Sequence, residues 1–231
     1  MRDAEAVGAT DLPTASARYD GHADWYDAWA QTAGAVAAAR VALEELLPAG
    51  SGPALDLGCG TGLHADVVRR RGYAVLGVDY SADQLRLACS RLPVLRADAR
   101  TLPFPDGSFV LVYSMLTHTD LDRFDRLVAE GLRVLASGGV FVYVGVHPCF
   151  VGPFVERQDD ALRLHRGYRA QGWQPRTAFT GTAVRHRVGV HHLQLESLLG
   201  AMLHPGTRLE AIVERGEGQL PEVLGVRLSC G

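Results

Sequence analysis

Mostly apolar runs along the chain alternate with longer stretches that have helical spacing. The runs cover residues 54–57, 74–78, 94–97, 109–115 and 140–146, and they do not alternate strictly between apolar and polar positions. Runs of this kind are typical of strands covered on both faces, as in a parallel sheet between layers of helices. The stretches between them predict a helix ending at Arg71, a helix over 81–92 with Ser81 as N-cap, and a helix over 121–135.

The two flanks extend this pattern. Residues 1–15 are predicted to be a flexible N-terminus, and 16–53 an alanine-rich helical cap that ends in a proline- and glycine-containing loop. Residues 54–147 would form the core, and 148–192, which lack a clean period, a lid or acceptor insertion after the fifth strand. A helix over 193–203 and strands over 208–214 and 223–229 would complete the core at 193–231 with an antiparallel hairpin at the sheet edge. The sequence therefore predicts a doubly wound α/β fold with a mostly parallel, seven-stranded sheet.

The composition fits a single globular domain and narrows the chemistry. Of 231 residues, 47% are hydrophobic and 21% are charged, and the net charge of −3 gives no reason to expect a nucleic-acid partner. All 23 basic residues are Arg, which excludes Schiff-base and P-loop lysine chemistry. The four cysteines form no CxxC pair, so neither a zinc ribbon nor a disulfide framework is predicted. The adjacent His191 and His192 would point to opposite sides of an extended chain, so no metal site is predicted there either.

The chain shows no signal-peptide profile at its start and no apolar run long enough for a bilayer. We therefore expect a cytoplasmic protein without a membrane partner, either a monomer or a homodimer.

The main motif is a glycine loop over Leu55–Gly62, with the sequence LDLGCGTG between a strand and a helix. Glycines allow the backbone to approach a ligand closely, and the helix N-terminus offers free N–H groups. Dinucleotide sites prefer GxGxxG, but Leu63 occupies the position of the third glycine. Asp56, two positions before Gly58, would repel a pyrophosphate and suits a ligand that carries an ammonium and a sulfonium.

Two further acidic residues follow strands of the predicted sheet. Asp79 follows the 74–78 strand, 21 residues after Gly58, at the spacing from which a carboxylate reaches a ribose diol. Asp98 follows the third strand, where an acidic side chain can accept a hydrogen bond from an adenine amino group.

Together these residues resemble the class I S-adenosylmethionine (SAM)-dependent methyltransferases, in their small-molecule, UbiE-like branch. Leu55–Gly62 is similar to the first family motif, residues 103–109 to the family's LPFxDxSFD segment, and residues 135–140 to its LxPGG turn. Two positions depart from the pattern. Val110 stands where the family usually has Asp, and Ala136-Ser137 replaces the proline of the later turn.

The resemblance implies SAM as cofactor, S-adenosylhomocysteine (SAH) as product, and a small-molecule acceptor. The run over 18–27 resembles a family opening whose tyrosines cover the cofactor and line the acceptor pocket, although packing of a helix on the sheet explains the aromatics equally well. The cofactor residues implied are Tyr19, Asp56, Gly58, Cys59, Gly60, Asp79, Tyr80, Gln84, Asp98, Ala99, Ser114 and Met115. The acceptor residues implied are Tyr26, His147 and Phe150.

Methyl transfer needs an in-line nucleophile and removal of its proton if it carries one. His118 and His147 follow the fourth and fifth strands, so either could be a catalytic general base, and a loop or cap role is the alternative. Asp120 could orient His118, but its position favours an N-cap for the helix over 121–135.

These observations predict a methyltransferase that acts on O, N or C of a small organic metabolite. A SAM-binding enzyme that does not methylate, such as a cyclase or decarboxylase, is the first alternative. A nicotinamide-dependent oxidoreductase is the second, disfavoured by Leu63 and Asp56.

Overall fold

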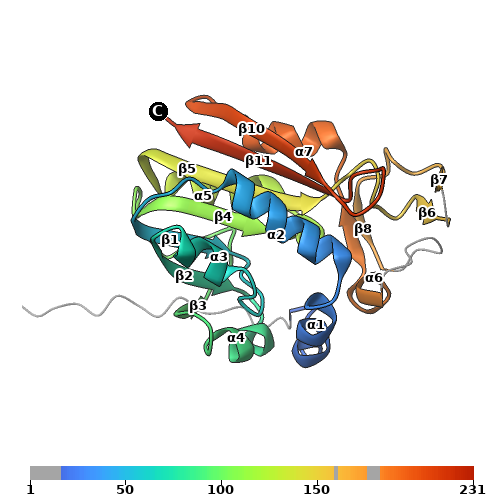
Figure 1. Cartoon of the computed structure of the whole chain (residues 1–231), viewed down its shortest axis with the longest axis horizontal. Helices are drawn as coiled ribbons and strands as arrows, with labels where there is room; N and C mark the ends of the chain where they lie inside the picture. The colour runs from blue at the N-terminus through green and yellow to red at the C-terminus, as the bar shows by residue number, and fades with distance from the viewer. Residues whose placement is uncertain (1–16, 159–160, 176–182) are drawn as a thin grey trace, which may run out of the picture.

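A computed structural model describes residues 17–158, 161–175 and 183–231, so the predicted flexible segment 1–15 lies outside the described residues. Its centre is a seven-stranded sheet with the order β10-β11-β5-β4-β1-β2-β3 (Figure 1). The strands are β1 (Gly52–Leu57), β2 (Tyr73–Asp79), β3 (Val94–Arg96), β4 (Phe109–Met115), β5 (Leu135–Val146), β10 (Thr207–Arg215) and β11 (Val223–Cys230). Strands β1 to β5 are parallel, and β11 pairs antiparallel with both β5 and β10. The predicted sheet and its terminal hairpin are confirmed, with β10 at the edge.

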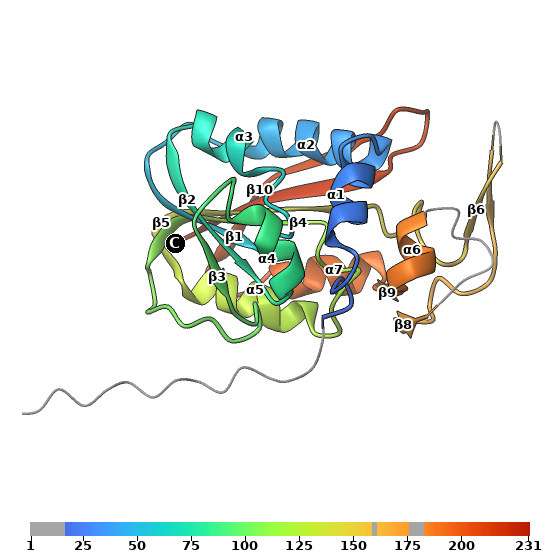
Figure 2. The ribbon, with the colours of Figure 1, turned by 90° about the horizontal axis from the view of Figure 1, so that it is seen from below.

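Helices cover both faces of the sheet (Figure 2). One face carries α2 (Gly34–Leu46) and α3 (Ala65–Arg70), and the other carries α5 (Phe124–Arg133) and α7 (Leu195–Met202). Along β4, Tyr113 packs into the apolar cluster under α2 and α3, whereas Val112 packs into the cluster under α5 and α7. Burying one such side chain contributes about 1.5–3 kcal/mol, so the two clusters hold the strand ends in register. None of the helices within the described ranges is both long and apolar enough to cross a bilayer.

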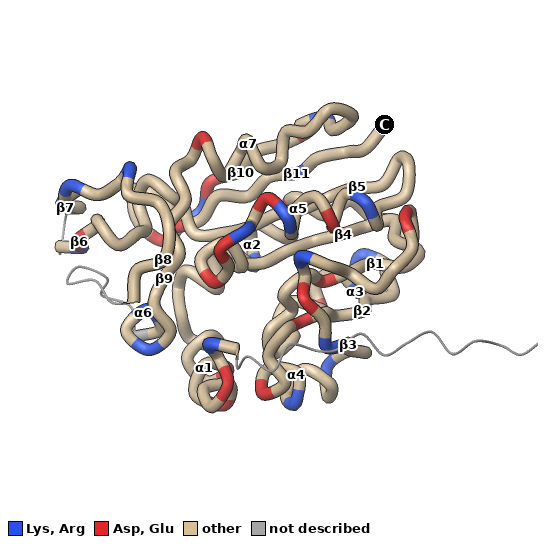
Figure 3. Tube along the Cα trace, turned by 180° about the vertical axis from the view of Figure 1, so that it is seen from behind, with Lys and Arg blue, Asp and Glu red and all other residues tan. Residues whose placement is uncertain are grey.

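The N-terminal cap consists of two helices, because the chain turns between Ala30 and Gly34. The first, α1 (Ala23–Ala30), lies against α4 (Ala82–Ala88) instead of on the sheet. Polar contacts connect the two segments: the backbone N–H groups of Gly21 and Ala23 donate to Asp83 Oδ2 at 2.9 and 3.2 Å. Charged residues are frequent on both helices (Figure 3). The first helix of the cap is therefore attached to α4, whereas the second packs on the sheet.

The insertion after β5 forms short paired strands, which explains why its sequence shows no period. Strand β6 (Val155–Arg157) pairs with β7 (Leu162–Leu164), and β8 (Gly172–Gln174) pairs with β9 (Val190–His192). A short helix, α6 (Ala183–Val188), precedes β9 and lies near α1 (Figures 1 and 2). The guanidinium of Arg187 lies 4.3 Å from the ring centroid of Trp25, so the insertion contacts the cap.

Two predicted helix starts have opposite outcomes. Ser81 is the N-cap of α4, where its hydroxyl accepts a hydrogen bond from the Gln84 N–H at 3.2 Å, as predicted. The predicted N-cap role of Asp120 is wrong, because α5 begins at Phe124 with Arg123 in the N-cap position. Tertiary partners hold the Asp120 carboxylate instead.

Candidate cofactor and acceptor site

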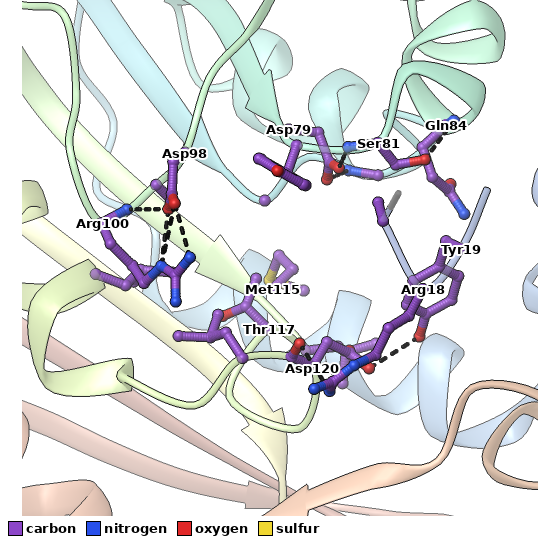
Figure 4. A pocket seen from close by; sticks show the side chains of 18 of the residues that line it. Arg18, Tyr19, Asp79, Ser81, Gln84, Asp98, Arg100, Met115, Thr117 and Asp120 are labelled. Atoms are coloured by element: carbon purple, nitrogen blue, oxygen red, sulfur yellow. Dashed lines mark hydrogen bonds and ion pairs between the residues drawn. The ribbon is translucent and has the colours of Figure 1, made fainter. Parts of the chain in front are cut away.

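A cavity of about 380 Å³ opens at the carboxyl ends of β1, β2, β3 and β4 (Figure 4). Its volume is in the range of small-ligand pockets. It is lined by Ala17, Arg18, Tyr19, Tyr26, Gly58, Gly60, Asp79, Tyr80, Ser81, Gln84, Asp98, Ala99, Arg100, Met115, Leu116, Thr117, Asp120, Leu121, Asp122 and Leu127. A second cavity of about 40 Å³ lies beside the glycine loop and is lined by Tyr26, Asp56, Gly58, Cys59, Gly60, Thr61, Leu63, His64, Met115 and Leu116. The two cavities share residues of the glycine loop and of the loop after β4.

The glycine loop packs too tightly for larger residues. Gly58 has a φ of +71°, and a Cβ there would lie 2.5 Å from Thr117 Cγ2. The Thr117 hydroxyl is 2.7 Å from the Ser114 hydroxyl, which donates to the carbonyl of Leu57 at 2.9 Å. The loop after β1 and the loop after β4 therefore support each other, and backbone lines the cavity between them.

Asp56 is buried on the floor of the small cavity. Its Oδ2 accepts a hydrogen bond from the Tyr113 hydroxyl at 2.8 Å, and its Oδ1 has no partner in the described part of the chain. Burial raises the pKa of Asp56 to about 7; the nearby Asp79 adds to this rise and the Tyr113 hydrogen bond opposes it. A cationic group entering this cavity would satisfy the open oxygen and favour the ionised carboxylate.

Three more buried polar atoms near the glycine loop lack a partner among the described residues: Thr61 Oγ1, His64 Nδ1 and Gln84 Oε1. Burial lowers the pKa of His64 to about 4, so its imidazole is neutral at neutral pH. Unsatisfied buried polar groups are uncommon in folded proteins, and their concentration here fits a polar ligand.

Asp79 lies at the end of β2, and each of its carboxylate oxygens accepts a hydrogen bond from a backbone N–H group. Oδ2 accepts from Gly60 and Oδ1 from Ser81, both at 2.8 Å. Burial raises the pKa of Asp79, and these two hydrogen bonds oppose the rise. The carboxylate is fixed at the cavity wall and keeps further lone pairs for ligand hydroxyls.

The carboxylate of Asp98 has an arginine partner that its position in the sequence does not indicate. Both of its oxygens contact the Arg100 guanidinium at 2.8–3.2 Å, and Arg100 also donates to Asp122 at 2.6 Å. These contacts hold the pKa of Asp98 below its usual value against the effect of burial. The far end of the cavity therefore presents an ion pair in place of a free carboxylate.

Two tyrosines from the N-terminal segment cover the cavity. The rings of Tyr19 and Tyr26 meet edge to face with centroids 5.2 Å apart. The Tyr19 hydroxyl donates to Asp120 Oδ1 at 3.2 Å, and Arg185 from α6 donates to the same oxygen at 2.8 Å. Burial raises the pKa of Tyr26 to about 12, so its hydroxyl stays protonated.

The cofactor residues implied by the family resemblance gather at these cavities, with one exception. Asp56 and Cys59 line the small cavity, and Ser114 lines neither cavity because its side chain is buried between Leu57 and Thr117. The others line the large one: Tyr19, Gly58, Gly60, Asp79, Tyr80, Gln84, Asp98, Ala99 and Met115. Tyr26, an implied acceptor residue, lines both.

The two histidines and Phe150 line neither cavity. His118 is buried, and its Nδ1 is hydrogen-bonded to the Tyr143 hydroxyl. Burial lowers the pKa of His118 to about 3. His147 has Nε2 2.8 Å from Glu214 Oε1, while Nδ1 accepts from the Cys149 N–H at 3.2 Å. The Phe150 ring lies beside His147, with centroids 4.7 Å apart.

Several residues that line the large cavity were not predicted as site residues, among them Arg100 and Thr117, and Asp120 was predicted only as an N-cap or as a partner of His118. Arg100 directly follows Asp98 and Ala99, two predicted cofactor residues, so its charge was a signal that could have been used. The partners of Asp120 come from segments 101 and 65 residues away, which no local pattern reveals.

Comparison with known proteins agrees with this geometry. A model of the methyltransferase domain matches residues 55–143. A fatty-acid O-methyltransferase from Mycolicibacterium smegmatis is 34% identical over 45% of this chain and 40% of its own length. A demethylmenaquinone methyltransferase from Thermus thermophilus is 34% identical over 43% of this chain and 50% of its own length. The chain thus spans about half or less of these curated relatives.

Similarity to solved structures extends further along the chain. A SAM-dependent methyltransferase from Mesorhizobium loti matches with a TM-score of 0.68 and 25% identity over 86% of this chain and 99% of its own. The [4+2]-cyclase SpnF also matches, with a TM-score of 0.54 and 24% identity over 84% of this chain and 64% of its own, which shows a shared fold only.

Proposed function

We propose that this chain, which belongs to the class I SAM-dependent methyltransferases, transfers a methyl group from SAM to a small organic acceptor. The observation that carries the proposal is the buried Asp56, which lines the cavity beside the glycine loop and whose Oδ1 has no partner among the described residues. A buried carboxylate whose oxygen lacks a partner is stabilised by a cationic or hydrogen-bonding partner. The ammonium of SAM is such a partner.

The residues present fit the rest of the cofactor. Asp79 would accept hydrogen bonds from the ribose hydroxyls, and Ala99, with the Asp98–Arg100 pair, would border the adenine. The small cavity, with Asp56 and His64, would take the amino-acid end. Bound SAM supplies a methyl group on a positively charged sulfur. The acceptor's lone pair forms the new bond to carbon, the carbon–sulfur bond breaks, and its electron pair stays on sulfur to give SAH.

The electrostatics disfavour the oxidoreductase alternative. Asp56 is the acidic side chain of the small cavity, and in the lining of the large one four carboxylates (Asp79, Asp98, Asp120 and Asp122) outnumber two guanidinium groups (Arg18 and Arg100). Carboxylates attract a sulfonium and repel a pyrophosphate. The cyclase-like alternative shares the cofactor and the fold, so it differs only in the reaction.

The proposed acceptor is a small metabolite methylated on O, N or C. Tyr26 borders the place where the two cavities meet and is the acceptor residue best supported by position. A general-base role for His118 or His147 stays a prediction. The position of their imidazoles does not support it, because neither residue lines a cavity. If His147 is the base, His147→Ala lowers turnover about 100-fold at unchanged SAM affinity; unchanged turnover removes it from the reaction.

Product analysis tests the reaction. The protein is incubated with SAM and a panel of small amines, phenols, quinols and carboxylic acids, and SAH and methylated products are measured by mass spectrometry. We expect SAH to form together with an equal amount of one methylated acceptor. Tight SAM binding with conversion of an acceptor that gains no methyl group would favour the cyclase-like alternative.

A further inference from the structure

The carboxylates of the large cavity occupy different places. Asp79 and Asp98 lie where the ribose and adenine would bind, whereas Asp120 lies across the cavity from Asp79 (Figure 4). Asp120 is half-buried, with 24% of its side chain exposed. Its place in the site therefore needs a separate explanation.

The point of methyl transfer can be located from the two cavities. The sulfur of SAM joins the nucleoside to the amino-acid end, so it would lie where the large cavity meets the small one. That junction is lined by residues common to both: Tyr26, Gly58, Gly60, Met115 and Leu116. Leu116 has a φ of +59°, a conformation that L-residues other than Asn and Asp seldom adopt. This turn redirects the chain after β4, and the Asp120 N–H then donates to the Thr117 carbonyl at 2.9 Å.

The two oxygens of Asp120 have different surroundings. Oδ1 accepts from the Tyr19 hydroxyl and from Arg185. The contact at Oδ2 is with the Thr119 hydroxyl at 3.2 Å, but that hydroxyl also lies 3.2 Å from the Leu116 carbonyl. A hydroxyl carries a single proton, so it can serve only one of these acceptors fully. Oδ2 therefore keeps the capacity to accept another hydrogen bond.

We propose that Asp120 contacts the methyl acceptor and receives a hydrogen bond from its nucleophilic N–H or O–H group, an inference that rests on the proposed methyltransferase function. This assigns the acceptor to the amines, alcohols and phenols. A carboxylate acceptor would be repelled, and a carbon nucleophile would leave Oδ2 unused. During transfer the acceptor's lone pair forms the new bond, the carbon–sulfur pair stays on sulfur, and the acceptor proton passes to Asp120 and then to solvent.

Arg185 explains how the carboxylate is kept in place. Its guanidinium donates to Asp120 at 2.8 Å and to the Thr119 hydroxyl at 2.6 Å, and 12% of its side chain is exposed. Both partners of the ion pair are therefore largely shielded from water, one on the insertion and one on the loop after β4. A purely structural role for Asp120 would be to hold the insertion through this pair, and the test must separate that role from acceptor contact.

The SAM analogue sinefungin provides an acceptor-independent probe, because a carbon atom replaces the sulfonium sulfur and carries an amine in the place of the methyl group. SAH lacks this amine and is the matched ligand. Isothermal titration calorimetry measures both on the full chain. We expect Asp120→Asn to weaken sinefungin binding about tenfold or more and to leave SAH binding within about twofold, because a hydrogen bond to a charged group is lost. An unchanged ratio of the two affinities would overturn the proposal.

Two further variants separate contact from structure. Arg185→Gln breaks the same ion pair but keeps the Asp120 charge, so it should change the ratio of sinefungin to SAH affinity less than Asp120→Asn does. An equal change in both variants would mean that Asp120 only holds the insertion. The double variant D120N/R185Q leaves no unpaired buried charge and should repeat the loss if D120N alone does not fold. Asp125→Asn, on the exposed side of α5, controls for the charge change. If the wild type binds neither ligand, the proposed function itself fails.

Discussion

The hydroxyl of Tyr113 and one oxygen of Asp56 are 2.8 Å apart beneath the glycine loop. Tyr113 comes from β4 and Asp56 from β1, and the parallel pairing of these strands places the two residues directly opposite each other. The bond fixes the orientation of the carboxylate, whose other oxygen has no partner among the described residues, and Asp56 lines the small cavity. A single pair of residues thus connects the sheet register to the ligand site.

The raised pKa of Asp56 predicts that SAM binding depends on pH. Only the ionised carboxylate attracts an ammonium, and with a pKa of about 7 the ionised fraction falls as pH is lowered through neutrality. SAM affinity should therefore fall roughly tenfold between pH 7.5 and pH 6. Calorimetry at several pH values measures this, and Asp56→Asn should bind weakly with a flat profile. Equal affinity of the wild type at both pH values would show that Asp56 does not contact the ammonium.

The same residue predicts a conflict between stability and ligand binding. The folded-state pKa is raised, so the stability that the protonated carboxyl contributes is complete below about pH 4 and is lost as pH rises through about 7. Above pH 7 the ligand-free protein contains a buried anion with one open oxygen. Asp56→Asn should then raise the free energy of unfolding at pH 8 by up to about 4 kcal/mol, measured by urea denaturation. A less stable variant at pH 8 would refute this account of Asp56.

Packing of the glycine loop predicts different effects for two Gly→Ala substitutions. Gly58→Ala adds a clash with Thr117 Cγ2 to the cost of a positive φ, whereas Gly138 has a similar φ of +74° and open space where a Cβ would lie. We expect losses of about 2–5 kcal/mol for Gly58→Ala and about 1–2 kcal/mol for Gly138→Ala. Urea denaturation of both variants measures the difference. Equal losses would mean that the Thr117 side chain can move away from the added Cβ with no loss of folding free energy.

The N-terminal segment, whose Tyr19 and Tyr26 line the large cavity, should control how long SAM or its product SAH stays bound. Arg91 donates to both oxygens of Asp27 at 2.5 and 2.8 Å and to the carbonyl of Thr61 in the glycine loop at 2.7 Å. Arg91→Gln should therefore speed SAH dissociation about three- to tenfold, measured by stopped-flow competition. Arg86→Gln, which removes an exposed contact from Arg86 to Asp24 of α1, is the matched control with little effect. Equal rates in both variants would contradict this role of Arg91.

The sequence predicts the central elements well because their signals are local. The limits of β4 agree with the apolar run at 109–115, and the Ser81 hydroxyl caps α4 as its spacing indicates. Asp56 and Asp79 lie at the carboxyl ends of β1 and β2, and Gly58 follows β1. These strand ends must meet in a parallel sheet, so the order of the residues along the chain is enough to bring them together.

The remaining features depend on contacts between distant segments. Asp120 suits an N-cap by position, but Tyr19 and Arg185 hold its side chain away from the start of α5. The strands of the insertion are three residues long, too short for any period to show. The histidines after β4 and β5 follow the strand ends as predicted, yet both are buried and have other partners, Tyr143 for His118 and Glu214 for His147.

The central claim is that this site binds SAM through the carboxylates at the strand ends. Isothermal titration of the full chain with SAM and NAD, repeated with Asp79→Ala, tests it most directly. We expect micromolar SAM binding, no NAD binding, and a loss of SAM affinity of at least about tenfold in the variant, because the ribose loses its hydrogen-bond acceptor. NAD binding without SAM binding, or unchanged SAM affinity in Asp79→Ala, would contradict the account.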